Sequence, residues 1–177
     1  MAWTTEVLDF WFGLAPEAWW RADPALDRLI SERFEPLWER ERANLPQAFL
    51  TGSEDALAAV ILFDQFPRNM FRGHADQFST DPLALGVAKG AVDLGLDEPL
   101  TPERRMFLYM PFQHSESLAD QERSLLLFTA LGDARALDFA KRHHDVIARF
   151  GRFPHRNALL GRAPRPDELA AGEVDPR

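Results

Sequence analysis

The sequence predicts an all-α protein, built of antiparallel helical hairpins packed side by side as in helix-repeat folds. Apolar residues recur at the three- and four-residue spacing of helices, and the alternation typical of strands is absent. Helix-capping residues followed by proline also recur along the chain. We expect about seven or eight helices of roughly 10 to 20 residues, joined by short turns.

The first two helices are expected near the N-terminus. A stripe of apolar residues predicts the first helix: Trp3, Val7, Phe10 and Trp11. The second occupies 23–44 and begins at Asp23-Pro24, because aspartate caps a helix and proline is tolerated in its first turn. Pro36 lies inside this segment and should bend or divide the helix at the turn before it.

Three further helix starts are marked in the middle of the chain. Ser53 can cap a helix, because a hydroxyl followed by two acidic residues complements the helix dipole. Asp81-Pro82 and Thr101-Pro102 repeat the cap-then-proline pattern, and Gly95 marks a C-terminal end.

The last two long helices are predicted from caps and stripes. Ser117 and Asp120 cap one helix, and Gly132 marks its end. A regular apolar stripe predicts the other: Ala136, Ala140, His143, Ile147 and Phe150. We expect residues 1–165 to form a single helical domain, with a short helix and a loose tail over 166–177.

Composition excludes several classes of protein. The chain has no cysteine, which excludes disulfides and thiolate chemistry and suits a reducing compartment, so we expect a cytoplasmic protein. The longest apolar run, 56–63, is too short to cross a membrane. A signal peptide would begin with basic residues, but the first basic residue here is Arg21. A net charge of −8 argues against nucleic-acid binding.

The charge is strongly segregated. Residues 141–165 hold seven lysines or arginines and the single acid Asp145, a net charge of +6, which leaves −14 on the rest. Such a run forms either an anion-binding surface or a solvated face paired with the acidic remainder of the chain.

Two turns repeat one pattern. Phe66-Pro67-Arg68-Asn69 and Phe153-Pro154-His155-Arg156-Asn157 each combine an aromatic residue, proline, arginine and asparagine. Proline should end the preceding helix and extend the aromatic residue before it, so both turns can serve as rigid corners. Alternatively, an arginine on such a corner can present its guanidinium to a carboxylate or phosphate.

Ionisable residues on apolar stripes are expected inside the protein. Asp64 extends one stripe and needs a partner, which Arg68 can supply four residues later. Arg33 lies on another stripe and can share that structural ion pair.

Four of the five histidines lie in the C-terminal half. His143 lies on the apolar stripe, and a lone inward histidine is most often a satisfied core residue, whereas His144 should face water. His114 and Glu116 are candidates for acid–base or metal chemistry, together with His143 and His155 if the fold brings them together. No metalloprotease, nucleotide-binding or hydrolase motif occurs, so we predict no metal and no cofactor.

All five tryptophans lie in the first 38 residues. Their stripe spacing favours packing in the core, and the alternative is an aromatic wall that lines a groove. Adjacent Trp19 and Trp20 cannot share one helix face, so at least one should be exposed.

The segments LDFWFG, ILFDQFPRNMFRG, STDPLAL, LYMPFQHSESLADQE and HHDVIARFGRFPHRNALLGR resemble the bacterial family called domain of unknown function 924, from about Leu8 to Arg162. The resemblance implies an all-helical, tetratricopeptide-like superhelix, a right-handed helical array, and implies no established activity. It places the family's characteristic polar residues at Arg33, Asp64, Gln65, Arg68, Asn69, Arg72, His114, Glu116, Gln121, His143, Arg149, Arg152, His155, Arg156 and Asn157.

Three functions remain open from the sequence. The first is the binding of an anionic small molecule or an acidic peptide end in a polar pocket. The second is an enzyme with histidine and glutamate acid–base or metal-assisted chemistry, and the third is a structural protein-interaction domain. The oligomeric state is left open. The candidate ligand-binding residues are Arg68, Asn69, Arg72, His114, Glu116, His143, Arg149, Arg152, His155, Arg156 and Asn157.

Overall fold

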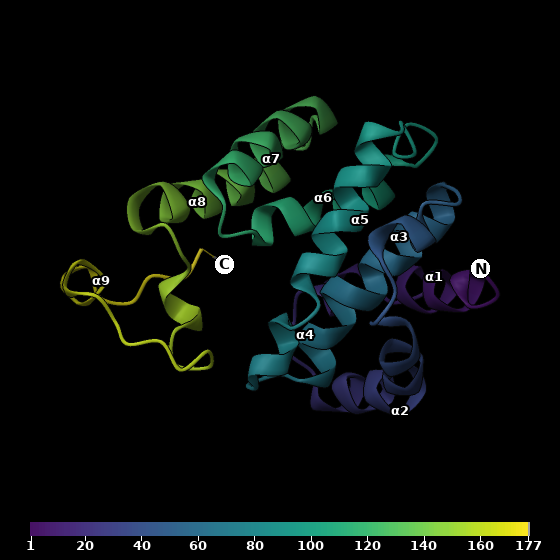
Figure 1. The fold of residues 1–177 in the computed structure, drawn as a ribbon, viewed down its shortest axis with the longest axis horizontal. Coiled ribbons are helices and arrows are strands. Elements are labelled where there is room, and N and C mark those ends of the chain that lie inside the picture. The colour runs from purple at the N-terminus through teal and green to yellow at the C-terminus, as the bar shows by residue number, and fades with distance from the viewer. Residues whose placement is uncertain (177) are drawn as a thin grey trace. The chain divides into compact units, whose positions relative to one another are not determined.

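A computed structural model describes residues 1–176, and within this range every regular element is helical, as the sequence predicts (Figure 1). The chain divides into two compact units, Met1–Pro111 and Phe112–Arg177, which are described separately. None of the helices in the described range combines the length and the apolar character that a membrane-spanning segment needs.

The helices follow one another with short connections. The first unit contains α1 (Thr4–Phe12), α2 (Pro24–Glu41), α3 (Ser53–Val60), α4 (Phe66–Met70), α5 (Asp81–Asp93) and most of α6 (Pro102–His114), with short turns η1 (Pro16–Trp19), η2 (Pro46–Phe49), η3 (Ile61–Gln65) and η4 (Ala75–Phe78). The second unit contains the end of α6, α7 (Leu118–Leu131), α8 (Ala134–Phe150), η5 (Pro154–Arg156) and α9 (Pro166–Ala171).

The helix α3 is the centre of the first unit. It is apolar on all sides after its first turn, and every residue from Ala56 to Phe63 is fully buried. The helices α1 and α5 both pack against it. A Cβ built on Gly90 of α5 would lie only 2.4 Å from Leu50, so glycine allows the segment after η2 to approach α5 closely.

The helix α2 is not divided at Pro36, and no helix ends at the residue before Pro67. The helix α2 runs without interruption through Pro36. Glu32 and Pro36 are exposed there, so water can solvate the carbonyl that Pro36 leaves without an N–H. Phe66 is helical rather than extended, because the π-helical turn η3 carries the chain from α3 directly into α4 and places Pro67 in the first turn.

Most of the tryptophans lie in the core. Trp3, Trp11 and Trp38 are buried, which confirms the prediction of core packing for these three. Trp20 is 55% exposed and stacks on Phe107, as expected if Trp19 and Trp20 cannot share one face.

The second unit is built on an antiparallel hairpin of α7 and α8, which lie side by side (Figure 1). Gly132 adopts the left-handed conformation that ends α7, and the carboxylate of Asp133 accepts two backbone N–H bonds that begin α8. The predicted stripe of α8, including His143, is buried. This hairpin is the base on which the following turn is built.

Candidate functional site

Phe153 is at the centre of the polar region of the second unit. The helix α8 ends at Gly151, whose φ of 67° turns the chain. Phe153 precedes Pro154 and is extended, with φ −90° and ψ 106°, as the sequence predicts for this corner. Its side chain is fully buried, which fixes the start of η5 against the unit.

Two histidines and one arginine lie around this ring, and a third histidine lies beside one of them. The ring centroids of His143 and His155 each lie 5.6 Å from that of Phe153. The guanidinium carbon of Arg156 lies over the same ring, 4.4 Å from its centroid, and the His114 ring lies 6.1 Å from that of His143. We call His114, His143, His155 and Arg156 the histidine–arginine cluster.

His143 is a neutral histidine in positive surroundings. Its pKa is lowered to about 4, mainly by burial and also by the charges of Arg156 and His155, while the Phe139 carbonyl and Asp175 act in the opposite direction. Its Nδ1 lies 2.8 Å from the Phe139 carbonyl oxygen, so the neutral ring donates its Nδ1 proton there. The Nε2 atom is then an acceptor at neutral pH.

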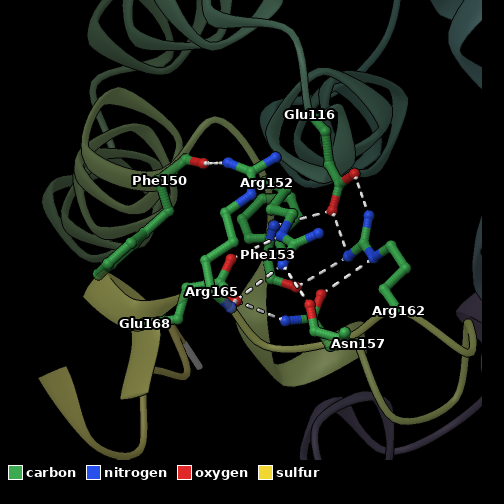
Figure 2. Close-up of polar contacts among 9 residues, drawn as sticks. Glu116, Phe150, Arg152, Phe153, Asn157, Arg162, Arg165 and Glu168 are labelled. Atoms are coloured by element: carbon green, nitrogen blue, oxygen red, sulfur yellow. Dashed lines mark hydrogen bonds and ion pairs between the residues drawn. The ribbon is translucent and has the colours of Figure 1, made fainter. Parts of the chain in front are cut away.

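Glu116 connects the end of α6 to the turn at Phe153. Its carboxylate accepts the Phe153 N–H at 2.8 Å and two hydrogen bonds from Arg162 at 2.7 and 3.0 Å (Figure 2). Burial alone would raise the pKa of Glu116, but the Arg162 and Phe153 bonds and the charge of Arg156 hold it below its usual value.

Glu168 of α9 is the second carboxylate of this region. Arg152 binds both of its oxygens, at 2.5 and 2.9 Å, and Asn157 donates to one of them at 2.9 Å (Figure 2). The Arg152 bond is the main cause that lowers the pKa of Glu168 to about 2, assisted by the Arg165 backbone N–H. The buried Glu168 therefore holds α9 to both sides of η5.

In the first unit, Arg68 joins two carboxylates. It lies 3.4 Å from Asp64, which is fully buried, and binds both oxygens of Asp81 at 2.9 and 3.1 Å. Burial alone would lower the pKa of Arg68, but the charges of Asp64 and Asp81 raise it. Arg68 therefore serves as an internal ion-pair partner at this turn, as its spacing from Asp64 predicts.

The rest of this turn is fixed to α2. Asp27 accepts from Asn69 at 2.8 Å and from Arg72 at 2.7 and 2.9 Å. Arg33 is not part of the Asp64 pair, contrary to the sequence interpretation. It is exposed and pairs with Glu6, since its flexible side chain reaches solvent from the edge of the α2 stripe.

The candidate residues thus fall into separate groups. The two similar turns belong to different units, so a polar pocket lined by candidate residues from both turns stays a prediction. Arg149 is exposed on α8 and lies over Phe150 rather than in the cluster.

Sequence reasoning missed Glu168 as a partner of Arg152 and Asn157, because it lies in the segment predicted to end in a loose tail. Within residues 1–176, no three histidine or acidic side chains are arranged to hold a metal ion.

Comparison with known proteins gives two matches. The family model described as "Bacterial protein of unknown function (DUF924)" matches residues 7–171. A solved structure of a protein of unknown function from Agrobacterium tumefaciens is 38% identical, with a TM-score of 0.88 and 98% of each chain covered. No curated protein matches the chain.

Proposed function

The chain belongs to the DUF924 family, and we propose that it binds an anion at the histidine–arginine cluster, through a carboxylate or phosphate of a small molecule or an acidic peptide end. The observation that carries the proposal is that the His143 and His155 imidazoles and the Arg156 guanidinium surround the ring of Phe153, with the His114 imidazole beside that of His143. A guanidinium is a common donor to such anions, and an imidazole donates through a nitrogen that carries a proton, which the Nε2 of His143 does only when that ring is protonated.

The electrostatics of the cluster support an anionic ligand. Burial is the main cause of the lowered pKa of His143; beyond it, Arg156 and His155 make the potential at that ring more positive and Asp175 makes it more negative. A bound anion would lower this potential and favour protonation of the histidines. Binding should therefore be coupled to uptake of a fraction of a proton.

The surroundings of the cluster support a preorganised site. The nearby carboxylates of Glu116 and Glu168 are each bound by another arginine, Arg162 and Arg152 respectively. These pairs fix the turn that carries His155 and Arg156, so less conformational entropy is lost when a ligand binds.

The acid–base alternative has less support. A pKa of about 4 makes His143 a weak base at neutral pH. Glu116 accepts hydrogen bonds from Arg162 and from the Phe153 N–H, which supports a role in fixing this turn.

We also propose that the helical hairpins are of the tetratricopeptide-like kind that the sequence resemblance implies. The α7–α8 hairpin, with its two-residue connection and its extensive packing along both helices, supports this arrangement. An array of such hairpins would present the turns between helices as a binding surface.

Calorimetric titration with inorganic phosphate, succinate and an acidic peptide tests the proposal and distinguishes the ligand sources. We expect one of the three to bind, and to stabilise the protein by about 2.7 kcal/mol at a hundredfold excess over its dissociation constant. Arg156→Gln should weaken this binding by about tenfold or more, because a charged hydrogen bond is lost.

Arg149→Gln is the matched control, because it removes the same charge from the exposed surface of α8. It should leave the affinity nearly unchanged. An equal loss of anion affinity in both variants would mean that only general charge attraction is at work, and this would contradict the proposal. The proposal would also be contradicted if none of the three anions bound.

A further inference from the structure

The side chain of Gln121 in α7 holds the chain on both sides of His114. Its Nε2 donates to the backbone carbonyl of Gln113 at 2.7 Å and to that of Ser115 at 2.8 Å. Because both partners are acceptors, the amide must present its NH₂ group to them, and this fixes its orientation. The Oε1 atom of Gln121 is therefore turned away from these carbonyls. The side chain is fully buried, and Oε1 has no hydrogen-bond partner among residues 1–176.

A second buried polar atom lies one turn further along the same face of α7. Ser124 follows Gln121 by three residues and is also fully buried. Its hydroxyl has no hydrogen-bond partner in the described part of the chain. Buried polar groups in proteins are nearly always hydrogen-bonded, because an unsatisfied one costs free energy. Gln121 and Ser124 therefore need a partner from outside the polypeptide.

Both side chains lie in the same part of the second unit as the histidine–arginine cluster. Gln121 is ten residues before the end of α7 at Leu131, and His143 is nine residues after the start of α8 at Ala134. Since α7 and α8 form an antiparallel hairpin, Gln121 and His143 are level to within about 1.5 Å along it (Figure 1). The His114 ring, which the chain carries between the two carbonyls bound by Gln121, lies 6.1 Å from that of His143.

This side of the cluster offers acceptors. The Oε1 of Gln121 can only accept, and the Nε2 of neutral His143 is an acceptor because its Nδ1 donates to Phe139. The hydroxyl of Ser124 can accept or donate. A carboxylate or phosphate oxygen brings no proton to such atoms, whereas a hydroxyl group donates to an acceptor and accepts from Ser124.

We propose that Gln121 and Ser124 bind a hydroxyl group of the ligand whose anionic group is held at the histidine–arginine cluster. The inference rests on the proposed anion-binding function and names the ligand class, a hydroxylated carboxylic acid or a hydroxylated phosphate ester. A hydroxyl is favoured over an ammonium group, which would also donate, because the guanidinium of Arg156 repels a second cation.

Calorimetric titration of the full chain with two pairs of probes tests the proposal. Malate carries a hydroxyl that succinate lacks, and glycerol 3-phosphate carries hydroxyls that propyl phosphate lacks. The first pair tests a carboxylate as the anionic group, and the second tests a phosphate. In the pair that binds, the hydroxylated member should have an affinity about fivefold to tenfold higher, because it makes an additional buried hydrogen bond.

Ser124→Ala should remove most of this preference without changing the affinity for succinate or propyl phosphate. It should not lower the urea midpoint of unfolding, since the lost hydroxyl has no partner in the described chain. Ser115→Ala is the matched control, because its hydroxyl donates to Asp120 at 2.8 Å and accepts the Ser117 N–H at 3.2 Å. This control should lower stability and keep the preference for the hydroxylated probe.

The outcomes separate the two proposals. Equal affinities within both pairs would mean that internal water satisfies Gln121 and Ser124, and this overturns the hydroxyl site while anion binding stands. A preference that survives in Ser124→Ala, or that is lost equally in Ser115→Ala, also overturns it. Binding of an acidic peptide but of none of these probes overturns the ligand class alone. If neither the peptide, inorganic phosphate nor any probe binds, the anion-binding function fails and this inference fails with it.

Discussion

The carboxylate of Glu116 and the guanidinium of Arg162 form a two-point ion pair, 2.7 and 3.0 Å long, between residues 46 positions apart. The same carboxylate accepts the backbone N–H of Phe153. One side chain in the connection between α6 and α7 therefore positions both the ring at the centre of the cluster and the chain that follows η5.

A double-mutant cycle tests this relationship. Glu116→Gln and Arg162→Met should each destabilise the protein by about 1–2 kcal/mol, because a partly buried charge loses its partner. The double variant should cost less than the sum, with a coupling of about 1 kcal/mol in urea unfolding. If the effects of the two single variants on the unfolding free energy simply added, the interaction between Glu116 and Arg162 would contribute nothing to stability.

The buried histidine makes stability depend on pH. The pKa of His143 is about 4 in the folded protein and near 6.5 when it is unfolded, so the unfolded chain binds the extra proton between these values. Stability should therefore fall as the pH drops from about 6.5 to about 4, by on the order of 3 kcal/mol.

His143→Gln removes this titration, and its unfolding free energy should change less over the same range. His144→Gln is the control, because the neighbouring side chain is 25% exposed and is one step round the helix from the buried stripe. Equal pH dependence in wild type and His143→Gln, measured by urea unfolding at pH 7 and pH 4.5, would contradict the neutral buried state.

Glu168 shows the opposite pH behaviour. Its pKa is lowered to about 2, chiefly by the hydrogen bond from Arg152, so its contribution is complete above about pH 4.5 and is lost as the pH falls toward 2. Glu168→Gln should therefore be less stable than wild type at pH 7, and the difference should shrink in acid. A difference that does not depend on pH would show that the charge of Glu168 is not responsible.

In the first unit, Asp27 should be the residue on α2 that holds the turn at Asn69 and Arg72. Burial alone would raise its pKa, but the bonds from these two partners lower it. Asp27→Asn should cost about 1–3 kcal/mol, because a charged acceptor with three hydrogen bonds is lost. Glu35→Gln, on the exposed face of the same helix, should change stability by less than about 0.5 kcal/mol.

Local signals predicted the helices well. Asp23 caps α2 as expected, and Thr101 accepts the Arg104 N–H at the start of α6. The period of the α8 stripe correctly placed His143 inside. These features depend on residues within one or two turns of each other, which are adjacent in sequence.

The errors occurred where residue types do not show the backbone conformation, or where residues distant in sequence determine the position of a side chain. Proline at 67 resembles a helix end, but the π-helical turn before it is not visible in residue types. Arg33 lies near an apolar stripe, and only the position of Glu6 shows that it points to solvent. The role of Glu168 depends on its contact with Arg152, which lies 16 residues earlier in the sequence. No local pattern predicts that α9 packs beside Arg152.

The most direct test of the anion site is a titration followed by the imidazole NMR signals of all five histidines, since each ring reports its own surroundings. If the cluster binds an anion, the signals of His114, His143 and His155 should move together and saturate with phosphate, succinate or acidic peptide. The exposed His74 of the first unit should stay in place at the same concentrations. Movement of His74 to the same extent, or unmoved signals for the three cluster histidines with every anion, would contradict the account.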